Sequence, residues 1–189
     1  MIFSVVIGLV IGLGIGGAVS HHYYNRAIEV NSRWENAQVQ LEELTEKESM
    51  VVALYFIKET ENESYLVPEL RKIPYSRNFT RTAVQELIAG PKTQDLQGVF
   101  SGRTKVLELE IKEDLAVIDL SKEATKLSRG AWGESLTVSA LVNTLTKFAE
   151  INQVKILIEG KEVETLSGHV DLTLPLRRNE QVVRLTEKN

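Results

Sequence analysis

The sequence has 189 residues, a net charge of -4 and no cysteine. Its length is enough for one domain of ordinary size with some chain to spare. The absence of cysteine excludes disulfides, thiolate metal sites, a cysteine nucleophile and a lipid anchor attached through a lipobox cysteine. The two signs of charge are nearly balanced, so a nucleic-acid partner has no electrostatic support.

Residues 1–20 contain no charged side chain. As a helix they would span about 30 Å, the thickness of the hydrocarbon core of a bilayer. A cleaved signal peptide would use Ala18, Val19 and Ser20 as its small-residue site, but no Lys or Arg precedes the apolar run. The His-Tyr pairs at 21–24 are typical of the membrane interface. We therefore expect an uncleaved transmembrane anchor at 1–20.

Three glycines in this segment, Gly8, Gly12 and Gly16, are spaced as two overlapping Gly-x-x-x-Gly motifs. Such motifs allow close contact between membrane helices. Glycine is also common in membrane helices without any such role, so both interpretations stay open.

Residues 21–49 are interpreted as a juxtamembrane segment followed by a helical stalk. Apolar residues alternate at spacings of three and four, at positions 27, 30, 34, 37, 41 and 44. This is the pattern of a short coiled coil. The pattern lasts under three heptads, so a stalk that lifts the domain off the membrane is preferred over self-association.

A domain is expected at 50–178, followed by a charged tail at 179–189. Alternating and helical apolar periods predict strands at 50–57 and 65–73, a helix at 79–89, a hairpin of strands at 107–112 and 116–120, a helix at 135–150, and strands at 154–158 and 170–176. The first strand is apolar on both faces and is therefore expected to be central in the sheet. Pro68 indicates that the second strand lies at an edge or contains a bulge. Gly90 and Pro91 end the first helix.

The helix at 135–150 is predicted to organise the domain. Its apolar stripe is Val138, Leu141, Val142, Leu145 and Phe148, and Ser139, Asn143 and Lys147 are expected to face away. Only three residues separate this helix from the strand at 154–158, so the helix must fold back onto the sheet. The result is an α+β fold with two helices on one face of a mostly antiparallel sheet.

A search for catalytic chemistry finds no active site, cofactor site or metal site. The domain has one histidine, His169, which would share a strand face with Asp171, but no Gly-x-Ser-x-Gly turn accompanies it. Carboxylates such as Glu108 and Glu110 belong to the solvated face of the hairpin. No phosphate-binding loop is present.

An ordered series of segments resembles the GerMN domain of sporulation and germination proteins. The segments are LVPELR at 66–71, LIAGP at 87–91, TKVL at 104–107, AVIDLS at 116–121, LVNTLTKF at 141–148, VKILIEG at 154–160 and GHVD at 168–171. The resemblance covers residues 50–178. It departs from the family at 100–103, where a proline-containing turn is expected.

The resemblance implies a non-enzymatic domain, tethered to the membrane on its extracytoplasmic side, with a fold similar to ring-building modules of secretion-like complexes. It brings no catalytic residue. Such domains are associated with spore-envelope assembly and cell-wall contact. The lipoprotein members carry a lipobox cysteine that this sequence lacks, so the glycine-rich helix would be the anchor.

Three functions remain as hypotheses. The first is an envelope interaction module that binds protein partners or itself, with Glu108, Glu110 and Lys112 as a contact surface. The second is a peptidoglycan-binding module, in which Tyr65, Tyr75 and Trp132 would stack on sugars. The third is a hydrolase that uses His169.

Overall fold

The computed structural model describes residues 26, 28–40, 49–126 and 130–185. The chain divides into two units, 1–48 and 49–189. In the first unit, residues 28–40 form a helix with an ion pair of 2.7 Å between Glu29 and Arg33, one turn apart. Within the described ranges, no helix is both long and apolar enough to cross a membrane. The predicted anchor at 1–20, with Gly8, Gly12 and Gly16, lies outside those ranges.

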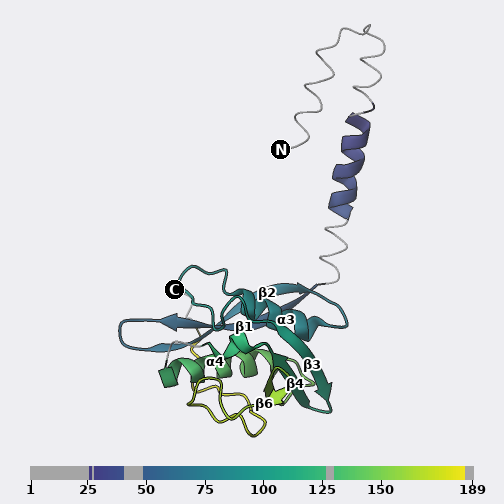
Figure 1. The fold of residues 1–189 in the computed structure, drawn as a ribbon. Helices are drawn as coiled ribbons and strands as arrows, with labels where there is room; N and C mark the ends of the chain where they lie inside the picture. The colour runs from purple at the N-terminus through teal and green to yellow at the C-terminus, as the bar shows by residue number, and fades with distance from the viewer. Residues whose placement is uncertain (1–25, 27, 41–48, 127–129, 186–189) are drawn as a thin grey trace. The chain divides into compact units, whose positions relative to one another are not determined.

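The second unit combines two small sheets with two α-helices (Figure 1). The elements are β1 (Ser49–Glu59), β2 (Ser64–Pro74), α3 (Phe79–Ala89), β3 (Val106–Lys112), β4 (Leu115–Leu120), the 3-10 helix η1 (Lys122–Thr125), α4 (Gly130–Leu145), β5 (Gln153–Ile158) and β6 (Lys161–Glu162). β1 and β2 form a two-stranded antiparallel sheet, and the other sheet has the order β3-β4-β5-β6. The predicted α+β class is confirmed, with two sheets in place of one.

The second sheet contains one parallel pair, β4 with β5, and α4 lies between these strands in the chain. A parallel pair needs such a crossover connection. α4 packs against β1 and β5, so it contacts both sheets, and it also packs against α3. The helix is therefore surrounded by protein on most sides.

This environment changes the predicted orientation of α4. Asn143 is fully buried and Ser139 is 8% exposed, so the prediction that both face away is wrong; Lys147, beyond the helix end, is exposed. The helix also begins and ends five residues earlier than predicted, which leaves Phe148 in a turn after the helix, still in the core. A helix that contacts both sheets buries its polar side chains along with its apolar stripe.

β1 and β2 differ in part from the prediction. β1 is buried on both faces from Leu54 to Ile57, as expected. Among the described residues its only ladder partner is β2, and its other edge makes one isolated bridge, from Ile57 to Gln97, so it is not a central strand. Pro68 lies opposite Tyr55 in an unbroken register, so the edge position is confirmed and no bulge forms there. The helix α3 has the predicted bounds.

The strand predicted at 170–176 does not form. Only Leu176 pairs with Val154, as an isolated bridge, and Leu174 is 71% exposed. β6 pairs only with the end of β5, at Leu157 and Ile158, and is reached through a tight turn in which Glu159 and Gly160 both have positive φ. Residues 163–175 then run as a loop.

The packed part of this unit continues beyond residue 178. The amide of Leu66 in β2 donates to the carbonyl of Val182 at 2.7 Å, and the amide of Arg184 donates to the carbonyl of Leu66 at 2.8 Å. Val182 is buried, with 5% of its surface exposed. The charged C-terminal segment is thus held against the outer edge of β2.

Candidate functional site

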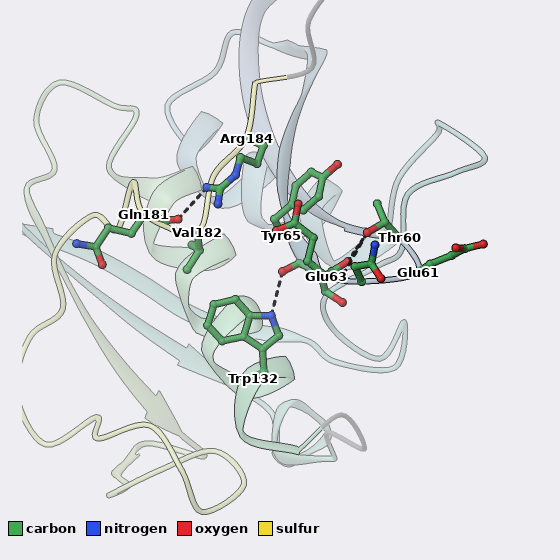
Figure 2. A pocket seen from close by; sticks show the side chains of 10 residues that line it. Thr60, Glu61, Glu63, Tyr65, Trp132, Gln181, Val182 and Arg184 are labelled. Atoms are coloured by element: carbon green, nitrogen blue, oxygen red, sulfur yellow. Dashed lines mark hydrogen bonds between the residues drawn. The ribbon is translucent and has the colours of Figure 1, made fainter.

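A hollow in the second unit lies beside the turn between β1 and β2 (Figure 2). Its volume is about 490 Å³. Three parts of the chain line it, namely the turn with the start of β2, the first turn of α4, and the C-terminal segment. The lining residues are Thr60, Glu61, Asn62, Glu63, Ser64, Tyr65, Trp132, Gln181, Val182 and Arg184.

The β1-β2 turn closes on itself through its own hydrogen bonds. The amide and hydroxyl of Thr60 both donate to the carbonyl of Glu63, at 2.9 and 3.0 Å. The amide of Glu63 donates back to the Thr60 hydroxyl at 3.2 Å. Because the backbone is satisfied internally, Glu61, Asn62 and Glu63 are left exposed as polar groups on one wall of the pocket.

Trp132 forms the opposite wall. Its indole Nε1 donates to the carbonyl of Ser64 at 2.9 Å, which ties the start of α4 to the start of β2. The residue remains 52% exposed. The indole has a single donor, and that donor is already used, so its exposed ring surface is apolar. A fixed and exposed aromatic ring is suited to stacking on a flat ligand.

Tyr65 and Arg184 lie across the pocket from Trp132 in the view of Figure 2. Arg184 donates from Nη1 to the carbonyls of Gln181 and Val183, at 3.1 and 3.2 Å. These bonds fix its guanidinium at the pocket, where no ion pair to a carboxylate forms among the described residues. The pocket therefore combines two aromatic rings with carboxylate, amide and guanidinium groups.

The sequence analysis named two of these residues. Tyr65 and Trp132 share the pocket, whereas Tyr75 stacks on Phe79 with ring centroids 5.9 Å apart and lies elsewhere. The sequence analysis did not select Glu61, Glu63, Gln181 or Arg184. The last two lie in the segment interpreted as a tail, which hydrogen bonds to Leu66 of β2 bring to the site.

His169 and Asp171 do not form the pair that a shared strand face would give. Asp171 accepts from the amide and hydroxyl of Thr173, at 2.8 and 2.6 Å. His169 instead has Nδ1 at 3.0 Å from the carboxylate of Glu134, a residue of α4 that is fully buried. Neither His169 nor Glu134 lines the pocket.

Glu134 holds the loop that carries His169. Its carboxylate accepts from the amides of Leu166, Ser167 and His169 and from the Ser167 hydroxyl, at 2.7 to 3.0 Å. Burial alone would raise the pKa of this carboxyl, but the hydrogen bonds from Ser167, His169 and Leu166 outweigh it and lower the pKa to about 2. Glu134 is thus an ionised anchor for a loop, which is a structural role.

The described part of the chain contains no group of three or more His, Cys, Asp or Glu side chains able to hold a metal ion. Of the hairpin carboxylates, Glu110 pairs with Lys112 at 2.8 Å. Taken together, the fold and the pocket define a small α+β domain with one open pocket of about 490 Å³ beside the β1-β2 turn.

Residues 53–164 match the family model described as Germane, sporulation and spore germination, which covers more than half of the chain. The chain belongs to this family, and the predicted GerMN-type domain is confirmed. The chain is 28% identical over 141 residues to the spore germination protein GerM of Bacillus subtilis (strain 168). That match covers 69% of this chain and 37% of GerM, so the chain spans well under half of its curated relative.

Solved structures show the same fold. The tandem GerMN domains of GerM from Bacillus subtilis superpose with a TM-score of 0.61 at 25% identity, over 73% of this chain and 49% of that one. A putative lipoprotein from Clostridium perfringens gives 0.52 at 28% identity, over 70% and 89%. The first GerMN domain of GerM gives 0.59 at 24% identity, over 68% and 98%, and supports the fold alone.

Proposed function

We propose that this protein is a membrane-anchored, extracytoplasmic interaction module of the cell envelope that acts in sporulation, germination or envelope assembly without catalysis. The observation that carries the proposal is the family match over residues 53–164. The relatives named above are described as sporulation, germination or lipoprotein components, and none of them carries the name of an enzyme.

The contact role is supported by the chemistry of the second unit. The one histidine of the domain, His169, contacts the buried carboxylate of Glu134, which anchors a loop. The pocket offers aromatic faces and hydrogen-bonding groups, which bind ligands without requiring an activated nucleophile. This arrangement favours binding over turnover.

The anchor is supported by the sequence of residues 1–20, which carry no charge over a length that matches a bilayer core. The chain has no cysteine for lipid attachment, so a helix is the available means of tethering. An anchored domain meets its partners on one side of a membrane, at a height set by the segment that follows.

Photo-crosslinking in cells tests the contact role. A photo-reactive residue replaces Asn62 in the pocket wall, and the matched control replaces Leu174, which is exposed outside the pocket. The proposal predicts discrete crosslinked envelope products from position 62 that are weak or absent from position 174. Equal, diffuse labelling from both positions, or cytoplasmic products alone, would contradict it.

A second candidate function is binding of peptidoglycan glycan strands. The observation that favours it is the presence of Tyr65 and Trp132 in one pocket, with the polar edge of Trp132 already bonded to Ser64. Sugar rings present flat C–H faces to aromatic rings and hydroxyls to polar side chains. The amide and guanidinium groups of Asn62, Gln181 and Arg184 are suited to those hydroxyls.

A further inference from the structure

β3 is an edge strand of the four-stranded sheet. A tight turn at Glu113 and Asp114 makes Lys112 and Leu115 the closing pair of the hairpin. Successive residues of an antiparallel strand direct their amide and carbonyl groups to opposite sides. Leu109 and Ile111 therefore direct theirs away from β4, and an edge of this kind is a template for another strand.

Only the first half of this edge is blocked. Arg81 donates from Nη2 to the carbonyls of Val106 and Leu107, at 2.5 and 3.2 Å, and the register is irregular between Val106 and Glu108. From 108 to 112 the register is unbroken, and no hydrogen bond between described residues caps the outer edge. Residues 108–112 are hereafter called the open edge.

The open edge has an apolar face that the domain covers incompletely. Leu109 lies opposite Ile118 and Ile111 opposite Ala116, and both partners are fully buried. Directly opposed residues point to the same face, so Leu109 and Ile111 extend the core side of the sheet. Ile111 is nevertheless 36% exposed, and an added strand would cover it.

The charges on the other face select the added strand. Consider a second copy of β3 that runs antiparallel to the first and is related to it by a two-fold axis at Glu110. Glu108 of each copy then lies opposite Lys112 of the other. Leu109 of each copy lies opposite Ile111 of the other, so the amide and carbonyl groups that point away from β4 can hydrogen-bond between the two strands. Glu110 then faces its own copy, and the neighbouring Lys112 of its own strand, at 2.8 Å, offsets that repulsion.

Other registers are less favourable. A shift by one residue places the outward amide and carbonyl groups of one strand opposite residues of the other strand whose groups point toward β4, so the hydrogen bonds between the two copies are lost. Of the two nearest registers that keep the bonds, one places Glu108 opposite Glu110, and such a like-charged pair is destabilising. The other places Glu110 opposite Lys112, but it sets residues 108 and 109 against the turn at Glu113 and Asp114, so only residues 110–112 of each strand can pair.

We propose that the open edge pairs with the open edge of a second copy of this chain, about a two-fold axis at Glu110, and joins two four-stranded sheets into one. This specifies a self-association surface within the proposed contact function, and it does not depend on the identity of other partners. The paired segment is short, so its interface falls below the ~1,600 Å² of a standard complex. We therefore expect weak association in dilute solution and stronger association when the chains share one membrane.

Disulfide trapping tests the register, because the chain has no native cysteine. In the proposed pairing, two Glu110 residues form a non-hydrogen-bonded pair with Cα atoms about 4.5 Å apart, within disulfide range. Glu108 is the matched control on the same face of the same strand, and its two copies would lie about 13 Å apart. The full chains of E110C and E108C are reconstituted in lipid vesicles and oxidised in a glutathione buffer.

The proposal predicts a disulfide-linked dimer from E110C and little from E108C. Equal yields from both, which anchor contacts alone would give, or no dimer from E110C, would overturn it. Unchanged thermal unfolding of both variants confirms that each is folded. This outcome is independent of the photo-crosslinking at Asn62, so failure of the self-association leaves the proposed function to its own test.

Charge exchange gives a second readout in the E110C chain. E108K or K112E alone places like charges opposite each other and should slow trapping severalfold. The double variant E108K/K112E restores opposite charges and should restore the rate. Single variants that trap as fast as E110C, or a double variant as slow as the singles, would show that these two side chains do not face each other.

Discussion

Asn143 and Asn179 bind each other through two reciprocal hydrogen bonds. The side chain of Asn143 donates to the carbonyl of Asn179 at 2.7 Å, and the amide of Asn179 donates to the side-chain oxygen of Asn143 at 2.9 Å. Arg178 adds a bond of 2.8 Å to the carbonyl of Asn143. A fully buried position in α4 thus holds the C-terminal segment whose continuation forms one wall of the pocket.

Replacing Asn143 by Leu should destabilise the domain by about 1–3 kcal/mol, because it leaves the backbone amide and carbonyl of the half-buried Asn179 without these partners. The matched control is Lys147→Leu, at an exposed position just after the same helix. Urea unfolding of the two variants measures the difference. A stability for N143L equal to that of K147L would show that the pair does not hold the segment.

Leu145→Asp should unfold the domain. Leu145 is fully buried in α4, and an unpaired charge there costs several kcal/mol against a total stability of about 5–15 kcal/mol. Thermal unfolding followed by circular dichroism provides the measurement, with Lys147→Asp as the exposed control. Cooperative melting of L145D at the wild-type temperature would contradict the assignment of this helix face.

Because of Glu134, the free energy of unfolding of the domain should decrease as the pH falls. Its pKa is lowered from 4.5 to about 2 in the folded chain, so the folded state favours the ionised form more than the unfolded state does. Its contribution, of order 3 kcal/mol, is therefore fully present above about pH 5 and is lost as the pH falls toward 2.

The variant Glu134→Gln tests this contribution, because it keeps the shape of the side chain and removes the charge. Unfolding free energies at pH 7 and pH 3 should differ less in E134Q than in the wild type, and the variant should be less stable at pH 7. An equal pH dependence in both proteins would assign the acid sensitivity to other carboxylates, such as Glu69, whose pKa is also lowered to about 2.

If the pocket binds peptidoglycan, Trp132→Ala should weaken retention of the full chain on purified sacculi severalfold, because stacking on a single aromatic ring contributes on the order of 1 kcal/mol. Tyr75→Ala is the control, since Tyr75 is 65% exposed and lies outside the pocket. Equal retention of both variants, or no retention of the wild type, would remove the glycan hypothesis and leave a protein ligand.

Local signals in the sequence predicted the elements whose boundaries are fixed by nearby residues. Gly90 has a positive φ directly after α3, so the helix ends at Ala89 as the Gly-Pro signal indicates. The hairpin followed from alternation around Glu113 and Asp114. Of the three aromatic residues named as candidates for stacking on sugars, Tyr65 and Trp132 line one pocket and Tyr75 does not.

Long-range contacts could not be predicted in the same way. Asn143 is polar, and only its partner Asn179 makes burial favourable. Residues 170–176 alternate like a strand, but only Leu176 pairs with β5, through an isolated bridge to Val154, and Leu174 is exposed. Leu107 and Ile111 alternate with charged residues in the predicted strand, yet they are 43% and 36% exposed because β3 lies at the edge of its sheet.

The central claim is that the domain works by contact on the extracytoplasmic side of a membrane, and a reporter fused after Asn189 tests it most directly. Two fusions are compared in a spore-forming host, one to an enzyme active only after export and one to a fluorescent protein that matures only in the cytoplasm. Because residues 1–20 are expected to place the domain outside, we predict activity from the first fusion alone. Fluorescence from the second fusion, with the first inactive, would contradict the topology and the envelope function with it.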